Sequence, residues 1–310
     1  MAPLVFLVTG ATSGIGAALV EHILSRGDKV IASGRKVEQR IGHLKSTSDN
    51  LALLELDITA GIAEVKAQIQ RAWNIFGHID VLMNNAGMSA AKTVEDADDA
   101  YVQNIFQVNV FGQVHTTQAI LPLFRGQGHG CVAFTSSSAG WMALPTMSHY
   151  SMTKAALSSF AEGLHKEVSG LGIRSVAFDC GGFITNLGQP REGEVSHSSP
   201  SAEPTEAYKP LFAEFMGVFA TNPLELMPGD PAKAASTMVD VIKGEGVAAG
   251  RPWAVRVVLG SDALDSAKRR REEELKLLND WAAVSANTDG RKYVPRADFR
   301  KYTVVTGVEH

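Results

Sequence analysis

Short apolar runs alternate with longer amphipathic stretches along most of the chain. Seven runs have the composition of buried strands, and they occupy 4–8, 29–33, 51–56, 79–83, 131–136, 173–178 and 253–259. Helical patterns lie between them, for example at 14–26, 62–76, 98–124 and 148–169. Apolar strands separated by helices indicate a parallel sheet covered on both faces. The pattern predicts an α/β fold with a doubly wound sheet of seven parallel strands, whose ligands bind beyond the carboxyl ends of the strands.

The same pattern suggests how the chain is divided. We expect one domain over 1–260, with a substrate lid at about 187–228, followed by a charged helix and tail over 261–310. Residues 187–206 are rich in Ser, Pro, Glu and Gly, which is typical of a mobile loop. The next run carries apolar side chains at near-helical spacing, namely Tyr208, Leu211, Phe212, Phe215, Met216 and Phe219. This stripe either covers a bulky apolar substrate or packs on the core, and both alternatives stay open.

The helical pattern at 266–281 is rich in charged residues of both signs. It predicts a solvated face with ion pairs from Lys268 to Glu272 and from Arg269 to Glu273. The acidic residues beside the basic run argue against nucleic-acid binding. The tail beyond about 285 has no interpretable pattern, and a homo-oligomer is left open.

Composition excludes several classes of protein. The 310 residues carry a net charge of −4, with a pI near 6.1, so there is no basic footprint for nucleic acid. No apolar run reaches the length of about 18 residues that a membrane span needs. The apolar start at 3–8 has no basic leader and reads as a strand instead of a signal peptide. Only Cys131 and Cys180 occur, which fits a reducing compartment, and we expect a cytoplasmic protein.

A glycine-rich segment, TGATSGIG, follows the first strand directly. Gly10, Gly14 and Gly16 open the next helix, where glycine allows a tight turn and lets backbone amides approach a pyrophosphate. Loops also need glycine for purely conformational reasons. The placement at the end of a strand favours the cofactor interpretation and a Rossmann-type dinucleotide site.

The end of the second strand indicates which dinucleotide binds. It reads IASGRK, with Gly34 and Arg35 and no carboxylate to hold a ribose 2′-hydroxyl. We therefore predict NADP(H), with Arg35 as the ligand of the 2′-phosphate and with Ser33 or Lys36 assisting. The alternative is that Arg35 is an ordinary solvated charge.

The segment YSMTK places Tyr150 and Lys154 one helical turn apart, so their side chains can touch. Stabilising a phenolate near neutral pH takes about 4 kcal/mol for three pH units. An ammonium roughly 5 Å away supplies about 3 kcal/mol at an effective dielectric constant near 20. The pair is therefore adequate, or nearly so, for proton transfer, although the spacing alone is not specific. His149 faces another side of the same helix, and we interpret it as structural. The nine histidines show no paired zinc spacing, so no metal is expected.

Five motifs occur in one order: TGATSGIG, NNAG at 84–87, VNV at 108–110, SSSAG at 136–140 and YSMTK. With these motifs the sequence resembles the short-chain dehydrogenase/reductase family over about 1–185, and in particular its single-domain subgroup with TGxxxGxG and YxxxK. The resemblance implies that Tyr150 is the proton donor or acceptor and that Lys154 lowers its pKa and binds the nicotinamide ribose. It further implies a substrate-oxygen donor at Ser137, thirteen residues before the tyrosine, and a water-holding role for Asn109.

Further site residues are expected from the resemblance, for the cofactor, and from position in the sequence, for the substrate. Cofactor binding is expected of Thr9, Gly10, Ser13, Gly14, Ile15, Gly16, Arg35, Asp57, Asn85, Gly87, Tyr150, Lys154 and Thr185. Substrate contacts are expected of Trp141, Met147, Phe183 and Phe212. One departure is Cys180, which stands where the family's PGxxxT motif has proline. Cysteine restores a backbone N–H and a free φ, so a more mobile loop is expected there; we interpret the thiol as inert.

These features predict an NADP(H)-dependent oxidoreductase acting on CH–OH groups. Hydride would pass between nicotinamide and the carbonyl or alcohol carbon of a small lipophilic metabolite. The alternatives are a non-redox member of the fold, such as an isomerase or cyclase, and an NADP(H)-binding sensor. The retained Asn109, Ser137, Tyr150 and Lys154 argue against a sensor.

Overall fold

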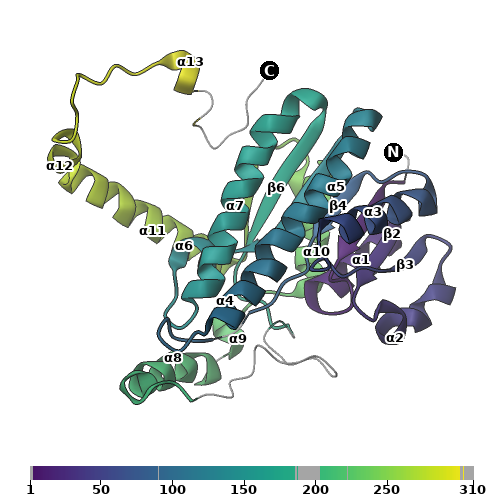
Figure 1. Ribbon diagram of the computed structural model, residues 1–310, viewed down its shortest axis with the longest axis horizontal. Coiled ribbons are helices and arrows are strands. Elements are labelled where there is room, and N and C mark those ends of the chain that lie inside the picture. Colours follow the sequence, from purple (N-terminus) through teal and green to yellow (C-terminus); the bar gives the residue numbers. More distant parts are fainter. Residues whose placement is uncertain are drawn as a thin grey trace.

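The computed structural model describes residues 3–89, 91–185, 187, 203–221, 223–300 and 303. Its centre is a parallel sheet of seven strands in the order β3-β2-β1-β4-β5-β6-β7 (Figure 1). The strands are β1 (Val5–Thr9), β2 (Lys29–Gly34), β3 (Leu51–Glu55), β4 (Val81–Asn84), β5 (Gly130–Ser137), β6 (Ile173–Cys180) and β7 (Arg256–Leu259). The predicted doubly wound α/β fold is confirmed. The strand order reverses between β1 and β4, where such sheets form a crevice for ligands.

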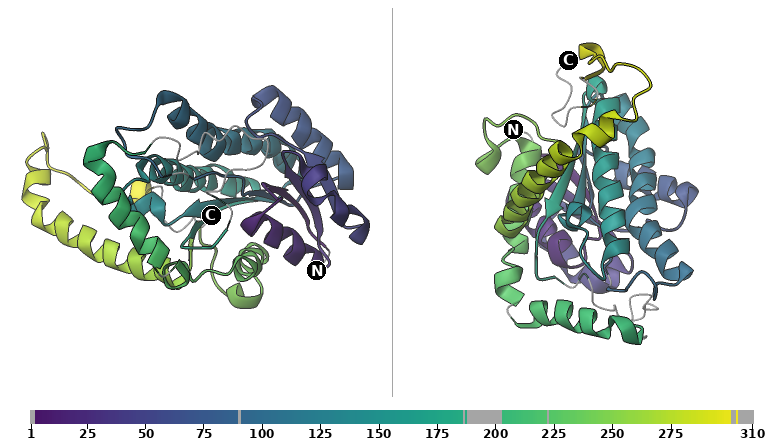
Figure 2. Two further views of the ribbon diagram at one scale, coloured as in Figure 1. Left: turned by 90° about the horizontal axis from the view of Figure 1, so that it is seen from below. Right: turned by 90° about the vertical axis from the view of Figure 1, so that its left-hand side faces the viewer.

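Helices cover both faces of the sheet (Figure 2). One face carries α1 (Gly14–Ser25) and α10 (Pro231–Lys243), and the other carries α3 (Ile62–Phe76), α5 (Gly112–Gln127) and α7 (Ser148–Val168). Successive side chains of β1 pack against the two helix layers alternately. Phe6 packs with α1 and α10, while Leu7 packs with α3 and α5. The near-continuous apolar strands in the sequence reflect this two-sided burial.

The predicted helix over 98–124 consists of three segments. They are α4 (Asp99–Phe106), a π-helical turn (Gln107–Phe111) and α5. Asp98 caps α4 by accepting a hydrogen bond from the Tyr101 amide, and Asp230 caps α10 in the same way through the Ala232 amide. The shorter helices are α2 (Val37–Ile41), α6 (Ala139–Met142), α9 (Pro223–Leu226), α12 (Ala282–Ala286) and α13 (Ala297–Arg300).

A buried charge fastens the edge strand β7 to β6. Asp179, almost wholly buried in β6, accepts a hydrogen bond from Ser158 Oγ at 2.9 Å and pairs with Arg256 of β7 at 2.7 Å. This strand starts at Arg256 and not at Trp253, as the apolar pattern suggested. The Trp253 indole instead donates to the Ser175 carbonyl.

The C-terminal helix α11 (Ser261–Asp280) begins against the sheet and then runs away from it (Figure 1). Its outer half is exposed, as predicted for a solvated helix. The predicted ion pair of Arg269 with Glu273 is wrong, because Arg269 binds Asp265 at 2.9 Å. An acid four residues before its base is the more favourable orientation on a helix. The boundary proposed at 260 stays a prediction. Within the described residues, no helix is both long and apolar enough to cross a membrane.

The apolar stripe after 206 forms α8 (Lys209–Thr221), which lies with α9 at the end of the molecule where the strands end (Figure 1). Phe212 and Phe215 are half-buried, while Leu211 and Met216 are exposed. No described α8 side chain joins the buried clusters, so the core-packing alternative is wrong. The lid hypothesis remains a prediction, and the loop at 188–202 and the Phe219 side chain lie outside the described residues.

Candidate active site

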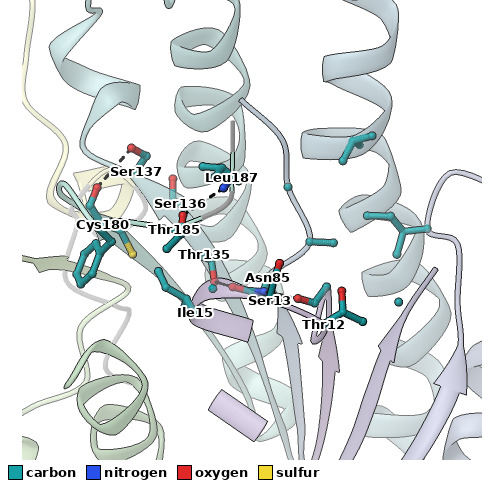
Figure 3. A pocket seen from close by; sticks show the side chains of 18 of the residues that line it. Thr12, Ser13, Ile15, Asn85, Thr135, Ser136, Ser137, Cys180, Thr185 and Leu187 are labelled. Atoms are coloured by element: carbon teal, nitrogen blue, oxygen red, sulfur yellow. Dashed lines mark hydrogen bonds between the residues drawn. The ribbon is translucent and has the colours of Figure 1, made fainter. Parts of the chain in front are cut away.

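A groove runs along the carboxyl ends of the strands. Many of the residues that line it were expected from the sequence: Gly10, Ser13, Gly14, Ile15, Arg35, Asp57, Asn85, Gly87, Ser137, Tyr150, Lys154, Phe183 and Thr185. Figure 3 shows part of this lining, with Ser137 and Cys180 at one end and Thr12 and Ser13 farther along.

The glycine-rich segment lines the groove with backbone. Gly10 and Gly14 have φ angles of 64° and 56°, in the left-handed region that side chains disfavour. Helix α1 begins at Gly14, and its first turn contains no acidic residue. Its N-terminal amides and dipole therefore suit a bound anion such as a pyrophosphate.

Behind this segment, a buried set of hydrogen bonds joins β1, β4 and β5. Thr9 Oγ1 accepts from the amides of Asn85 and Ala86 at 3.0 and 3.1 Å. The Asn85 side chain donates to the carbonyls of Thr9 and Gly10 and accepts from Thr135 Oγ1. Thr9 itself is buried and does not line the groove. It holds the loop in place instead of presenting a side chain to a ligand.

Gly16 has the same supporting position. A Cβ atom placed on it would lie 2.2 Å from the Gly10 carbonyl oxygen and 2.5 Å from Asn85 Nδ2. Gly16 does not line the groove either, so it allows helix and loop to approach closely. Thr9 and Gly16 lie behind the residues that line the groove, and their part in cofactor binding stays a prediction.

At the adenosine end expected from the sequence, Gly34 and Arg35 line the groove. Ser33 is fully buried and donates to the Val8 carbonyl at 2.9 Å, so the suggested help from Ser33 is wrong. Its hydroxyl is thus engaged by the neighbouring strand β1. Next to Arg35, the Glu55 carboxylate accepts from the amides of Lys36 and Val37 at 2.5 and 3.0 Å. A carboxylate, which was not expected here, thus reaches this end from β3.

Asp57 and Gly87 also line the groove, as expected. Asp57 Oδ1 accepts from the amide and the hydroxyl of Thr59, at 2.9 and 2.7 Å, which fixes the turn after β3. Gly87 lies between two polar side chains, since a Cβ on it would be 3.4 Å from Asn109 Oδ1 and 3.6 Å from Lys154 Nζ. A methyl group there would lie at ordinary van der Waals distance from both.

At the other end of the groove, the end of β5 meets the start of α7. Ser137 is the last residue of β5, and Tyr150 and Lys154 lie in the first two turns of α7. Lys154 Nζ donates to the Thr135 carbonyl at 2.8 Å and lies 5.6 Å from the centre of the Tyr150 ring. The Ser137 hydroxyl accepts from the Ala139 amide at 3.2 Å and donates to the Cys180 carbonyl at 3.4 Å (Figure 3).

Burial shifts the pKa values of Tyr150 and Lys154 in opposite directions. It raises the pKa of Tyr150 to about 12, against a smaller lowering by the Ser137 hydroxyl beside it. It lowers the pKa of Lys154 to about 8, partly offset by the nearby Cys180 and Asp179. At neutral pH the phenol is therefore protonated and the ammonium is charged. In this state of the protein, burial outweighs the lowering of the tyrosine pKa that the resemblance implies.

Asn109 lies in the π-helical turn, directly behind these residues. Its side chain accepts from the Met88 amide and donates to the Met88 carbonyl and Thr153 Oγ1. It is completely buried and does not line the groove. Asn109 therefore joins α7 to the loop after β4, and its role in a proton relay stays a prediction. Turns of π-helix are frequent at functional sites.

Of the four expected substrate contacts, Phe183 lines the groove and Trp141, Met147 and Phe212 do not. Met147 packs against the buried cluster of Tyr101, Ile105, Ala139 and Tyr150. His149 is buried edge-on against the Tyr101 ring, which agrees with a structural role, and burial lowers its pKa. Burial raises the pKa of the Cys180 thiol to about 12, which agrees with an inert cysteine.

Three residues at the groove carry no signal in the local sequence. Thr135 holds Lys154 through its backbone carbonyl, and any residue type supplies that atom. Glu55 accepts a hydrogen bond from the Val37 amide, 18 positions earlier in the chain, and Asp262 accepts one from the Gly182 amide, 80 positions earlier. Glu55 could have been found from the register, because it pairs with Gly34 across the sheet.

Comparison with known proteins agrees with this fold and groove. Residues 4–195 match the family model described as short chain dehydrogenase. The chain belongs to the short-chain dehydrogenase/reductase family and is an oxidoreductase of that family.

Individual relatives extend the similarity beyond the matched segment. "Oxidoreductase BOA17" of Botryotinia fuckeliana is 30% identical over 91% of this chain and 97% of its own. The "NADPH-dependent 1-acyldihydroxyacetone phosphate reductase" of Saccharomyces cerevisiae is 34% identical over 60% of this chain and 63% of its own. A solved short-chain dehydrogenase from Streptomyces avermitilis is 32% identical, with a TM-score of 0.77, and the match covers 93% of this chain and 100% of that chain.

Proposed function

We propose that this protein is an NADP(H)-dependent reductase of a carbonyl group on a small lipophilic metabolite. The observation that carries the proposal is that Ser137, Tyr150 and Lys154 lie at one end of a groove that Arg35 lines at the other end. The glycine-rich turn and the N-terminus of α1 between them suit a pyrophosphate. The groove therefore fits a dinucleotide with its nicotinamide beside Tyr150.

The protein's own residues have separate tasks in this proposal. When bound, the nicotinamide supplies the hydride. The Ser137 hydroxyl donates to the substrate oxygen and stabilises the negative charge that develops on it. Tyr150 delivers the proton to that oxygen, and its raised pKa keeps the phenol protonated at neutral pH, which favours reduction over alcohol oxidation. Lys154 gives one donor to Thr135 and keeps others for the ribose hydroxyls.

The preference for NADP(H) rests on Arg35 and Gly34 at the end of β2. Comparing the dissociation constants of NADPH and NADH tests it, and tighter binding of NADH would refute this part of the proposal. The yeast relative is named for NADPH dependence, which supports the same choice for this chain.

Turnover tests the reaction itself. NADPH consumption is followed over a panel of ketones, aldehydes and quinones, with Tyr150→Phe in parallel. We expect the substitution to reduce turnover at least about a hundredfold. Tyr101→Phe is the matched control, since Tyr101 is equally buried and burial raises its pKa to about 12 as well, but it does not line the groove. NADPH binding without turnover on any carbonyl would favour the sensor or the non-redox alternative.

A further inference from the structure

The turn that follows β6 is held by a carboxylate from a distant part of the chain. The Gly182 amide donates to Asp262 Oδ2 at 2.7 Å, while the Gly181 amide donates to the Leu259 carbonyl at 2.8 Å. Asp262 lies in the first turn of α11, directly after β7. The C-terminal helix thus fixes Gly182, while the last residue of β7 fixes Gly181.

The fit around the carboxylate leaves no room for larger residues. A Cβ on Gly181 would lie 2.5 Å from both carboxylate oxygens of Asp262, and a Cβ on Gly260 would lie 2.4 Å from Oδ1. Oδ1 is buried and has no hydrogen-bond partner within the described part of the chain. Asp262 is therefore half-buried, with the backbone of Gly181 and Gly260 close to its carboxylate.

The turn carries two residues into the proposed nucleotide groove. Phe183 and Thr185 follow Gly182 directly, and both line the groove. Thr185 reaches the glycine-rich segment, since a Cβ on Gly14 would lie 3.2 Å from Thr185 Cβ. On the far side, the Gly229 amide donates to the Gly182 carbonyl at 2.9 Å. Any shift of Gly182 would move the wall of the groove opposite the glycine-rich segment.

The preceding residue explains why such a restraint is needed. Cys180 ends β6, so the turn lacks the fixed φ that a proline at this position would give. Two consecutive glycines then add conformational freedom. A carboxylate hydrogen-bonded to the Gly182 amide restricts that freedom from outside the turn.

We propose that Asp262 is a positioning residue, which orders the turn at Gly181 and Gly182 and so holds Phe183 and Thr185 against the nicotinamide half of the bound dinucleotide. The inference rests on the proposed function, because it requires a dinucleotide in the groove. It links the C-terminal helix, which lies beyond the family-model match, to cofactor binding.

The experiment compares binding of a whole dinucleotide with binding of its adenosine half. Dissociation constants for NADPH and for adenosine 2′,5′-bisphosphate are measured by calorimetry for wild type, Asp262→Ala and Asp262→Asn. Asp265→Ala is the control, since Asp265 lies one turn further along α11 in an exposed pair with Arg269. Thermal unfolding of each variant reports on the fold.

We expect Asp262→Ala to weaken NADPH binding about tenfold, the effect of losing a hydrogen bond to a charged group, and to leave the bisphosphate unchanged within about threefold. Asp262→Asn keeps an acceptor oxygen and should lie between wild type and the alanine variant. The control should bind both ligands as wild type does.

Other outcomes separate the two proposals. Unchanged NADPH affinity in both Asp262 variants would overturn the positioning role while leaving the reductase intact. Equal weakening of both ligands would indicate a general loss of structure and would also overturn it. If Asp262→Ala fails to fold, Asp262→Asn and Asp262→Ser are measured instead. Each is compared with wild type by the ratio of its dissociation constants for NADPH and for the bisphosphate. A wild-type protein that binds neither ligand would instead refute the proposed function.

Discussion

Lys154 Nζ lies over the ring of Tyr150, 5.6 Å from its centre, and makes its 2.8 Å hydrogen bond to the backbone carbonyl of Thr135. The ammonium is therefore held by β5 and not by the phenol that it is expected to assist. Burial lowers the pKa of Lys154 and raises that of Tyr150, so it destabilises the charged form of each group. The pair is consistent with a charged lysine and a neutral tyrosine near pH 7.

The lowered pKa of Lys154 predicts how the reaction depends on pH. The ammonium is present below pH 8 and is lost as pH rises through about 8, well before a free lysine would lose its proton. We expect the rate of NADPH-dependent reduction to fall over that range. Lys154→Arg stays charged and should not show this fall, whatever its absolute rate. The initial rate measured from pH 6.5 to 9.5 checks this, and a fall of the same shape in both proteins would assign it to another group.

Glu55 predicts a change in cofactor preference. Its carboxylate is bound to the Lys36 and Val37 amides, next to Arg35, where a 2′-phosphate is proposed to lie. Glu55→Gln removes a negative charge near a dianion, so NADPH should bind about two- to tenfold more tightly while NADH changes little. Glu38→Gln, on α2 and paired with Lys45, is the control. Equal changes in the affinities for NADPH and NADH would show that Glu55 affects the shape of the turn and does not interact with the 2′-phosphate.

Thr9 should affect stability before it affects binding. Its hydroxyl satisfies the amides of Asn85 and Ala86 inside the protein. Thr9→Val keeps the shape but removes the acceptor of the Ala86 amide, at about 1–3 kcal/mol of unfolding free energy, while the Asn85 amide keeps the Met83 carbonyl. Thr9→Ser retains the hydroxyl and should lose less. Urea unfolding measures both variants, and a Thr9→Val protein as stable as wild type would show that the Ala86 amide finds another partner.

Gly16 should tolerate no side chain. In Gly16→Ala the new methyl group would meet the Gly10 carbonyl, which must move and carry the glycine-rich segment with it. We expect NADPH binding to weaken at least about tenfold, because backbone geometry determines how amides meet a pyrophosphate. Gly126→Ala in α5, where a Cβ meets nothing within 4 Å, is the matched control and should bind normally. Normal binding by both variants would argue that the segment adjusts.

The elements that could be predicted from the sequence are those with local signals. Strands β1 to β6 were found because two-sided burial makes them continuous apolar runs, and the glycines of TGATSGIG mark a turn by residue type alone. Ser33 was misjudged because its residue type does not reveal that its hydroxyl is buried and bonded to the Val8 carbonyl of the neighbouring strand. Met147 was misjudged because apolar residues near an active site can equally fill the packing behind the catalytic tyrosine.

Contacts between distant segments could not be predicted in this way. Asp262 reads as an ordinary acidic residue in the first turn of a charged helix, and only the fold brings it to Gly182. Glu55 reads as the polar end of a strand until β3 is paired with β2. Both depend on strand order and register, which one sequence with no alignment does not determine.

The position of β7 at the edge of the sheet has a consequence for how the chain folds as it is synthesised. β6 can pair with β5 as soon as residue 180 has emerged, but its outer edge then has no neighbour, and Asp179 has no arginine, until Arg256 arrives some 75 residues later. At about 5–20 residues per second this interval lasts seconds, during which an open edge strand can pair with another chain. We therefore expect chains that stop before β7 to aggregate, because only the last strand covers the open edge of β6.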